Sequence, residues 1–344
     1  MDAISSGMLR SPGVVADGLF ATEAAALYER VRRVVPPAEW DVFVPDIEAI
    51  LRLKRERNAV VLAHNYQTPE IFNTVADIVG DSLALARKAA EVEADVIVLC
   101  GVHFMAETAK LMNPDKTVLI ADLRAGCSLA ESITGADVRA LKAQYPGVPV
   151  VTYVNTSAEV KAESDICCTS GNAVEVVESL GVERVIFLPD EYLARNVAAG
   201  TSVEIISWHG KCEVHERFSP EDIASLRHDY PGITVLAHPE CDRPVVEAAD
   251  FAGSTAAMAS FVARRQPARV ALITECSMSD NVALANPEVE FVRPCNLCPH
   301  MKRITLPAIR HSLETMTHEV TVPAAVADRA RQAVERMVAI GRGK

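Results

Sequence analysis

The sequence lacks three features that would place it on a membrane, outside the cell or on nucleic acid. No apolar run approaches the roughly 20 residues that span a bilayer, and the N-terminus has no charged region followed by an apolar one, as a secretory signal would. It also has no long Lys/Arg block, and its formal net charge of -12 disfavours general binding to polyanions. With 49% hydrophobic residues in a chain of 344, a globular, cytoplasmic protein with a sizeable core is expected, one that binds neither membranes nor nucleic acid.

Cysteine, in contrast, is abundant. The chain has nine cysteines, an odd number without a secretory signal, which favours free thiols or metal ligands over a disulfide framework. Cys295 and Cys298 form a C-x-x-C step, yet no second C-x-x-C follows it anywhere in the chain. A paired four-cysteine knuckle is therefore not the obvious use of these two thiols.

The chain contains three copies of a unit of about 85 residues, the kind of period that indicates a repeat architecture. Each copy opens with an apolar strand, at 58–67, 148–157 and 233–242. An acidic step and a hydroxyl pair follow and lead into a helix, at 76–86, 164–174 and 249–259. A second strand with a loop and a short helix occupies 94–111, 182–199 and 268–285. A third strand closes each copy and ends on Cys127, Cys212 or Cys298, which are 85 and 86 residues apart.

Continuous Val/Ile/Leu strands that alternate with helices predict parallel sheets covered by helices on both faces. Three similar units in one chain most simply assemble around a pseudo-threefold axis. We therefore predict an α/β fold of three homologous α/β/α domains around a central active site. Its expected parts are N-terminal helices at 1–57, repeats at 58–130, 131–217 and 218–303, and C-terminal helices at 304–344. Because parallel sheets bind ligands beyond the carboxyl ends of their strands, the strand-end residues should face one central cavity.

Three thiols that meet on such an axis suit a [4Fe-4S] cluster, with Cys127, Cys212 and Cys298 each holding one iron and the fourth iron left open to act as a Lewis acid. The rival is zinc in a Cys3His site, with His215 or His300 as the fourth ligand. Cys295 is the fallback for Cys298 and is otherwise a spare thiol. The remaining cysteines are expected in the core: Cys100, Cys167, Cys168, Cys241 and Cys276.

Hydroxyl groups stand where a helix begins in each copy, at Ser82, at Ser170 and at the pair Ser254 and Thr255. Singly each reads as an N-cap, but three in phase around one cavity favour binding of carboxylate or phosphate at helix N-termini.

The first strands end in side chains suited to proton transfer and hydrogen bonding, namely His64, Tyr66, Tyr153, Asn155, His238 and Glu240. We expect His64 and His238 to add charge-assisted bonds to anionic substrates. Burial in the cavity is expected to raise the pKa of Glu240 toward a working range.

Long motifs in order resemble those of the quinolinate synthase family. They are HNYQTPE (64–70), ADIVGDSL (76–83), GVHFMAETAKLMNPDK (101–116), GCSLAE (126–131), YVNTSAEVKAESD (153–165), CTSGNA (168–173), WHGKCEVHERF (208–218), AHPEC (237–241), GST (253–255) and CNLCPHMK (295–302).

The resemblance implies condensation of iminoaspartate with dihydroxyacetone phosphate to quinolinate, phosphate and water in de novo NAD biosynthesis, at a [4Fe-4S] cluster held by Cys127, Cys212 and Cys298. It also implies a transient partner, an L-aspartate oxidase that supplies iminoaspartate. Catalytic roles fall on His64, Tyr66 and Glu240. Substrate contacts fall on His64, Ser82, Tyr153, Asn155, Ser170, His238, Glu240, Ser254 and Thr255, and Met105 would line the pocket near the cluster.

Three other functions fit the same residues. A zinc-dependent lyase or hydrolase would use the Cys3His site, and a different [4Fe-4S] dehydratase would use the cluster on another substrate. A thiol-disulfide or binding module would depend on the Cys295 and Cys298 pair alone.

Overall fold

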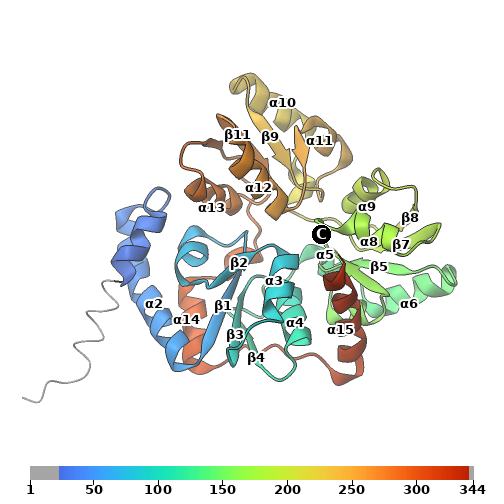
Figure 1. Cartoon of the computed structure of the whole chain (residues 1–344), viewed down its shortest axis with the longest axis horizontal. Coiled ribbons are helices and arrows are strands. Elements are labelled where there is room, and N and C mark those ends of the chain that lie inside the picture. The colour runs from blue at the N-terminus through green and yellow to red at the C-terminus, as the bar shows by residue number, and fades with distance from the viewer. Residues whose placement is uncertain (1–22, 341–344) are drawn as a thin grey trace, which may run out of the picture.

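The computed structural model describes residues 23–340 and shows three separate four-stranded parallel sheets, which confirms the predicted α/β class. The first 22 residues of the predicted segment 1–57, and the last four of the tail 304–344, lie outside the described residues. Figure 1 shows the three sheets as three lobes, with domain 1 in blue and cyan, domain 2 in green and domain 3 in yellow and orange.

All three sheets have the same strand order, with the first strand second from one edge. In the first sheet the order is β2-β1-β3-β4, formed by Ile78–Gly80, Ala59–His64, Val96–Cys100 and Thr117–Ile120. In the second it is β6-β5-β7-β8, formed by Ile166–Cys168, Val150–Tyr153, Arg184–Leu188 and Glu204–Ser207. In the third it is β10-β9-β11-β12, formed by Phe251–Ala252, Thr234–Ala237, Arg269–Ile273 and Glu290–Val292.

The short edge strands β2, β6 and β10 are the elements that the sequence pattern did not predict. They lie within the segments read as an acidic step, and the acid has the same structural role in each sheet. Its carboxylate accepts a hydrogen bond of 2.8 Å from a main-chain N–H of the neighbouring strand, in the pairs Asp77 with Val61, Asp165 with Val150, and Asp250 with Val235. The repeated acid therefore pins the edge strand to the sheet and is not a cavity residue.

Helices cover the sheets, as the alternation of strand and helix segments in the sequence predicted. Domain 1 has α3 (Ser82–Ala89), α4 (His103–Met112) and a π-helical turn at Ile71–Val75. Domain 2 has α5 (Ser128–Glu131), α6 (Gly135–Gln144), α7 (Ala158–Ala162), α8 (Ala173–Ser179) and α9 (Glu191–Ala198), followed by a 3-10 turn at His215–Arg217. Domain 3 has α10 (Pro220–Asp229), α11 (Arg243–Ala248), α12 (Thr255–Arg265) and α13 (Ser277–Ala285), followed by a 3-10 turn at Met301–Arg303.

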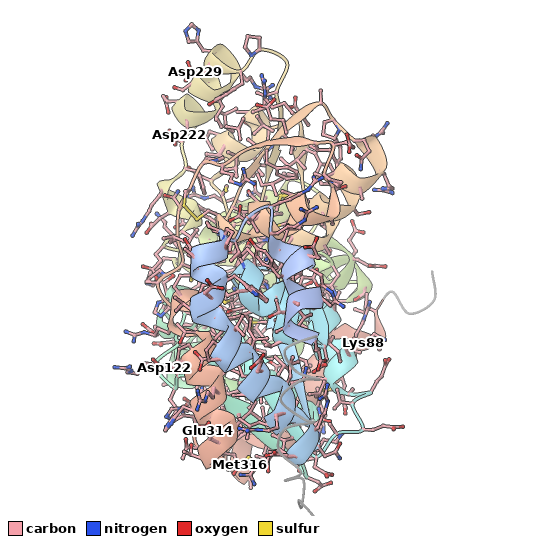
Figure 2. The ribbon with its side chains drawn as sticks, turned by 90° about the vertical axis from the view of Figure 1, so that its left-hand side faces the viewer. Lys88, Asp122, Asp222, Asp229, Glu314 and Met316 are labelled. Carbon is pink, nitrogen blue, oxygen red and sulfur yellow. A yellow bond between two sulfur atoms is a disulfide. The ribbon has the colours of Figure 1, made fainter. Side chains whose placement is uncertain are left out.

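The terminal helices pack on domains 1 and 2. Residues 23–31 are helical and precede α2 (Pro37–Glu56), which packs against α14 (Leu306–Thr315), as the adjacent blue and salmon helices of Figure 2 show. The last helix, α15 (Ala324–Ala339), packs on α7 and β6 of domain 2 and on α4 of domain 1. Of the helices within residues 23–340, none is both long and apolar enough to cross a membrane.

The apolar core is continuous through domain 1, much of domain 2 and the terminal helices. Domain 3 has its own two clusters, one on each side of its sheet, around Val235 and Ala271 and around Leu236 and Leu272. The alternation of neighbouring strand residues between the two clusters follows from the two-residue period of a strand. Both faces of the third sheet are therefore covered within its own domain.

Candidate active site

A cavity lies where the three domains meet, and all three contribute to its wall. Domain 1 supplies His64, Tyr66, Ser82, Met105 and Cys127, domain 2 supplies Tyr153, Asn155, Ser170, Cys212 and His215, and domain 3 supplies His238, Glu240, Thr255, Cys298 and His300. Most of these residues directly follow a strand or lie near the start of the next helix. The structure thus brings the predicted strand-end residues into one site.

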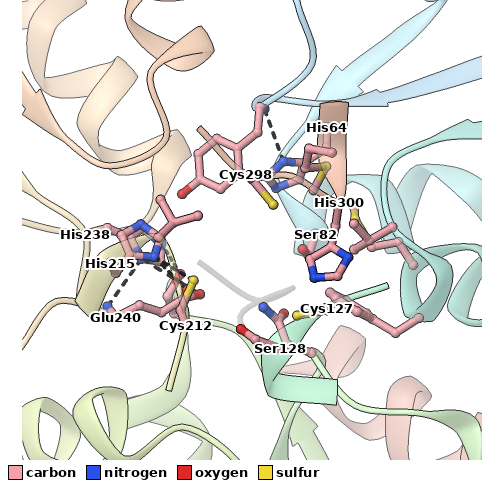
Figure 3. Close-up of a pocket in the computed structure, with 18 of the residues that line it drawn as sticks. His64, Ser82, Cys127, Ser128, Cys212, His215, His238, Glu240, Cys298 and His300 are labelled. Carbon is pink, nitrogen blue, oxygen red and sulfur yellow. Dashed lines mark hydrogen bonds and ion pairs between the residues drawn. The ribbon is translucent and has the colours of Figure 1, made fainter. Parts of the chain in front are cut away.

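The three cavity cysteines, Cys127, Cys212 and Cys298, each follow the last strand of a different sheet. Figure 3 shows their sulfur atoms turned toward the same space. Burial raises the pKa of all three thiols, that of Cys127 to about 12, and the charges of neighbouring thiolates and of Glu240 add to the effect at Cys127 and Cys212. The raised pKa values keep the three groups as neutral thiols, and a bound metal ion would be needed to hold them as thiolates.

The loops that carry these cysteines are tied to one another by polar contacts. The hydroxyl of Ser128 donates to Lys211 O at 3.1 Å and accepts from Glu213 N at 3.1 Å, which joins the loops after Cys127 and Cys212. The carboxylate of Glu213 in turn lies 3.0 Å from Nε2 of His300, which follows Cys298. Glu213 therefore orients the ring of His300 through Nε2, and this contact does not exclude Nδ1 as a metal ligand.

The other cysteines divide into two groups. Cys100, Cys167, Cys168 and Cys241 are buried and lie in strands or beside them, in agreement with the core positions predicted for them. Cys276 and Cys295 form a disulfide with a Cα–Cα distance of 4.8 Å. Cys276 is buried as predicted, but the preference for thiols or metal ligands over a disulfide was wrong for this pair, because α13 brings Cys276 beside a loop that is 19 residues away in sequence.

The imidazoles of His64 and His238 are oriented in the same way by the main chain. Nδ1 of His64 accepts from the N–H of Tyr66 at 3.2 Å, and Nδ1 of His238 accepts from the N–H of Glu240 at 3.3 Å. A neutral imidazole that accepts at Nδ1 carries its proton on Nε2. Nε2 of His238 lies 3.1 Å from the hydroxyl of Ser170. Both rings therefore have an Nε2–H donor available for hydrogen bonding.

The side chains of His64 and His238 are neutral in this site. Burial lowers the pKa of His64 to about 4 and that of His238 to about 3, and the negative charge of Glu240 only partly offsets it. Both rings are therefore neutral at pH 7, and the expected charge-assisted bonds to anionic substrates would draw their charge from the substrate oxygens. They can bind a carboxylate or phosphate as neutral donors.

A chain of short contacts links Tyr66 to Glu240 through two residues. The hydroxyl of Tyr66 lies 2.6 Å from Oγ1 of Thr274, which lies 2.9 Å from Nε2 of His215. Nδ1 of His215 lies 2.9 Å from Glu240 and 3.1 Å from the sulfur of Cys212. With the Nδ1 proton held by Glu240, Nε2 accepts from Thr274, so a proton can pass between Tyr66 and His215.

The pKa of Glu240 is lowered, whereas it was expected from the sequence to be raised. Burial alone would raise it, but the charges of His215 and His238 and hydrogen bonds from His215 and Tyr153 outweigh burial and hold the pKa below its usual range. The hydroxyl of Tyr153 donates to Glu240 at 2.5 Å. The prediction that burial raises this pKa was wrong, and Glu240 is a carboxylate that orients its neighbours.

Burial raises the pKa of Tyr66 well above its usual value, and the charge of Glu240 adds to the effect. The same two causes raise the pKa of Tyr153. Both phenols are therefore protonated at neutral pH.

The hydroxyl groups predicted to cap helices have different positions. Only Ser254 is an N-cap, accepting from Ala257 N at 3.3 Å, and it is not among the residues that line the cavity, whereas its neighbour Thr255 is. Helix α3 is capped by Asp81 and begins at Ser82, and α8 begins two residues after Gly171 with Asn172 before it. Ser82 and Ser170 thus face the cavity without serving as caps.

Asn155 lines the cavity and carries a buried Oδ1 without a hydrogen-bond partner among the described residues. An unsatisfied buried acceptor costs free energy unless a ligand or water supplies a donor. Its position in the cavity lining suits an acceptor for an N–H or O–H of a substrate.

The donor set can be compared with the two metal centres that the sequence left open. Cys212, His215 and Glu240 have ligand atoms within 4.8 Å of one another, but both nitrogens of His215 already have partners. A zinc site with His215 would have to break its bond to Thr274 or to Glu240. Three thiols from three loops fit the protein ligands of a [4Fe-4S] cluster with one open iron, and zinc with His300 stays the alternative.

His215 and Thr274 are the functional candidates that sequence reasoning missed or placed differently. His215 entered only as a zinc ligand, and Thr274 did not enter at all. Thr274 directly follows β11, so the rule that strand ends face the cavity would have found it. The role of His215 follows only from contacts between domains 2 and 3.

Comparison with known proteins identifies the family of the chain. The family profile described as quinolinate synthetase A protein matches residues 48–339. "Quinolinate synthase 2" of Mesorhizobium japonicum is 72% identical over 317 residues, covering 92% of this chain and 98% of that protein. "Quinolinate synthase" of Agrobacterium fabrum is 72% identical with 92% of each chain covered, and that of Xylella fastidiosa is 72% identical with 87% and 88% covered. The chain therefore belongs to the quinolinate synthase family of enzymes, which act in NAD biosynthesis.

Proposed function

We propose that the protein condenses iminoaspartate with dihydroxyacetone phosphate to form quinolinate, phosphate and two waters. The observation that carries the proposal is the meeting of three thiols, one from each domain, in a cavity that also holds a proton relay. The nucleophilic enamine carbon displaces phosphate, and a tautomerisation exposes an aldehyde. The nitrogen then closes the ring with loss of water.

Neutral donors would hold the substrates. The Nε2–H groups of His64 and His238 and the hydroxyls of Ser82, Ser170 and Thr255 are placed to bind carboxylate and phosphate oxygens, while Oδ1 of Asn155 accepts from the substrate nitrogen or a hydroxyl. Within residues 23–340 no Lys or Arg lines the cavity. Binding of the anions therefore depends on hydrogen bonds and on the metal centre.

Proton transfers would pass through Tyr66. When a substrate C–H or O–H gives its proton to the phenolic oxygen, the phenolic proton moves by way of Thr274 to Nε2 of His215, and Glu240 stabilises the resulting imidazolium. The reverse movement returns a proton to a departing hydroxyl. One relay thus serves both tautomerisation and dehydration.

The three cavity cysteines would hold a [4Fe-4S] cluster. When bound, the cluster supplies an open iron that acts as a Lewis acid on a substrate oxygen. The protein holds the cysteine loops together through Ser128 and Glu213, and Met105 and Phe104 add apolar wall around them.

Anaerobic purification with iron, sulfide and zinc analysis tests the metal centre, and an assay of quinolinate from the two substrates tests the reaction. We expect about four irons and four sulfides per chain, little zinc, and quinolinate formation. Stoichiometric zinc in a colourless protein would instead support the zinc lyase, and a cluster without quinolinate would support a different dehydratase. Transient contact with an L-aspartate oxidase and a cytoplasmic location also stay predictions, which pull-down and fractionation can check.

A further inference from the structure

Three cavity residues, Tyr66, Asn155 and Glu240, occupy corresponding loops, one after the first strand of each sheet. Each lies between two residues whose carbonyl oxygens point to a side-chain donor. These carbonyls are not satisfied by the sheet, because the strand has already ended. The donor differs among the three domains, but in each domain one side chain donates to both flanking carbonyls.

In domain 1 the donor is Asn281, which lies in α13 of domain 3. Its Nδ2 donates to Asn65 O at 3.2 Å and to Gln67 O at 2.8 Å, the two carbonyls that flank Tyr66. Asn281 is buried, and its Oδ1 accepts from Asn73 at 3.0 Å, which fixes the orientation of the amide. The loop of domain 1 is thus held from domain 3.

In domain 3 the donor is Asn196, which lies in α9 of domain 2. Its Nδ2 donates to Pro239 O at 2.8 Å and to Cys241 O at 2.9 Å, the two carbonyls that flank Glu240. Asn196 is the sixth residue of α9 and Asn281 the fifth residue of α13, so they occupy matching places in two repeats. The loop of domain 3 is thus held from domain 2.

In domain 2 the matching place on α4 of domain 1 carries Glu107, which cannot donate. Its carboxylate accepts instead from Ala158 N at 3.0 Å, at the start of α7. The donor is Lys161 of α7 itself, whose Nζ bonds Val154 O at 2.9 Å and also Thr156 O, the carbonyls that flank Asn155. Lys161 is fully buried, and its Nζ lies 5.4 Å from the centre of the Phe104 ring.

Burial of a lysine side chain costs free energy. The two hydrogen bonds of Lys161 indicate that it stabilises the loop of Asn155. Burial lowers the pKa of Lys161, and the charge of Glu107 in domain 1 acts in the opposite direction. Domain 2 thus replaces the amide by a lysine side chain and keeps the same two hydrogen bonds to the loop.

We propose that Asn281, Lys161 and Asn196 are positioning residues that fix Tyr66, Asn155 and Glu240 by clamping the carbonyls on either side of each. Two of the clamps cross a domain boundary, from domain 3 to domain 1 and from domain 2 to domain 3, whereas Lys161 lies in the domain whose loop it holds. They touch no substrate and act only through the residue they hold. The kinetic part of this inference rests on the proposed function.

The test compares Asn196→Asp and Asn281→Asp with Asn113→Asp, all in the cluster-containing full chain. The change is isosteric and replaces the two donors by acceptors. Asn113 is the matched control, because its Nδ2 donates to Ala89 O at 2.8 Å and Ala109 O at 3.0 Å, in domain 1 and away from the cavity lining. We expect kcat per iron to fall about 10- to 100-fold in the two clamp variants, as for a small misplacement of a reacting group, and to stay unchanged in the control.

Two further measurements separate positioning from loss of stability. Hydrogen exchange should accelerate at 238–242 in Asn196→Asp and at 64–67 in Asn281→Asp, without a general increase. In a Glu240→Gln background, Asn196→Asp should add little further loss of kcat, since both changes act through one residue. If Asn196→Asp does not fold, Asn281→Asp and its exchange pattern decide.

Clamp variants with kcat per iron within about twofold of wild type would overturn the inference, as would an equal loss in the control. Absence of quinolinate formation in the wild-type protein would defeat the proposed function instead. In that case the hydrogen-exchange rates at 238–242 and 64–67 alone test whether the clamps hold their loops.

Discussion

Replacement of Glu240 by Gln removes one charge from the relay with little change of shape. Glu240 is buried and contacts His215 at 2.9 Å and Tyr153 at 2.5 Å. The negative charge stabilises the imidazolium that forms when Tyr66 gives up its proton. For charges about 4 Å apart at an effective dielectric of about 20, this interaction is worth about 4 kcal/mol. At about 1.4 kcal/mol per tenfold, kcat should fall roughly 10³-fold.

The assay is anaerobic steady-state quinolinate formation, normalised to iron content. KM should change much less than kcat, because the lost interaction develops only as the proton moves. Tyr153→Phe is the graded comparison, since it removes one hydrogen bond to the carboxylate and leaves the charge. Its loss should be about 10- to 100-fold, as for a hydrogen bond to a charged group.

A kcat for Glu240→Gln within about tenfold of wild type would refute the reasoning, because no orientation of the new amide restores the charge. A loss that merely tracks missing iron would refute it as well. In that case the carboxylate would support the metal centre and not the relay.

Three other predictions concern the thiols and histidines. Replacing any one of the three cavity cysteines by Ala should abolish the cluster, whereas Cys295→Ala should retain it; equal iron loss in all four variants would contradict the assignment of ligands. Maleimide labelling of the denatured, metal-free, unreduced chain should modify seven cysteines and leave Cys276 and Cys295 for labelling after reduction, and nine modified cysteines without reduction would disprove the bond. Since His64 and His238 take up protons near pH 6.5 when unfolded but only near pH 4 and 3 when folded, the metal-free protein should lose about 3 kcal/mol of stability from pH 6.5 to pH 5. Denaturant titration at the two pH values measures this, and His238→Gln should abolish about half of the change.

Features that recur with the repeat were predictable from the sequence. The cysteine of each third strand recurs in phase, so symmetry alone places Cys127, Cys212 and Cys298 around one centre. The fold class follows for the same reason. The residue period cannot show a two-residue edge strand such as β10, because a segment this short has no alternation to detect.

Features that arise between repeats were not predictable. His215 and Thr274 meet because the turn after Cys212 packs beside the end of β11, and neither residue recurs in the other copies. The pKa of Glu240 depends on that meeting, so burial alone suggested the wrong direction. The disulfide of Cys276 with Cys295 likewise required two loops of one domain to be placed in space.

The last helix has a consequence for how the protein is made. Helix α15 is the final element of sixteen residues, and it rests on α4, α7 and β6. Its buried face is apolar, formed by Ala330, Ala333, Val334, Met337 and Val338. A polypeptide that is truncated before α15, or not yet fully synthesised, therefore contains all three sheets and every cysteine. It nevertheless exposes the apolar surface of domains 1 and 2 that α15 would cover. Chaperones and proteases that recognise such surfaces can therefore tell an unfinished chain from a finished one.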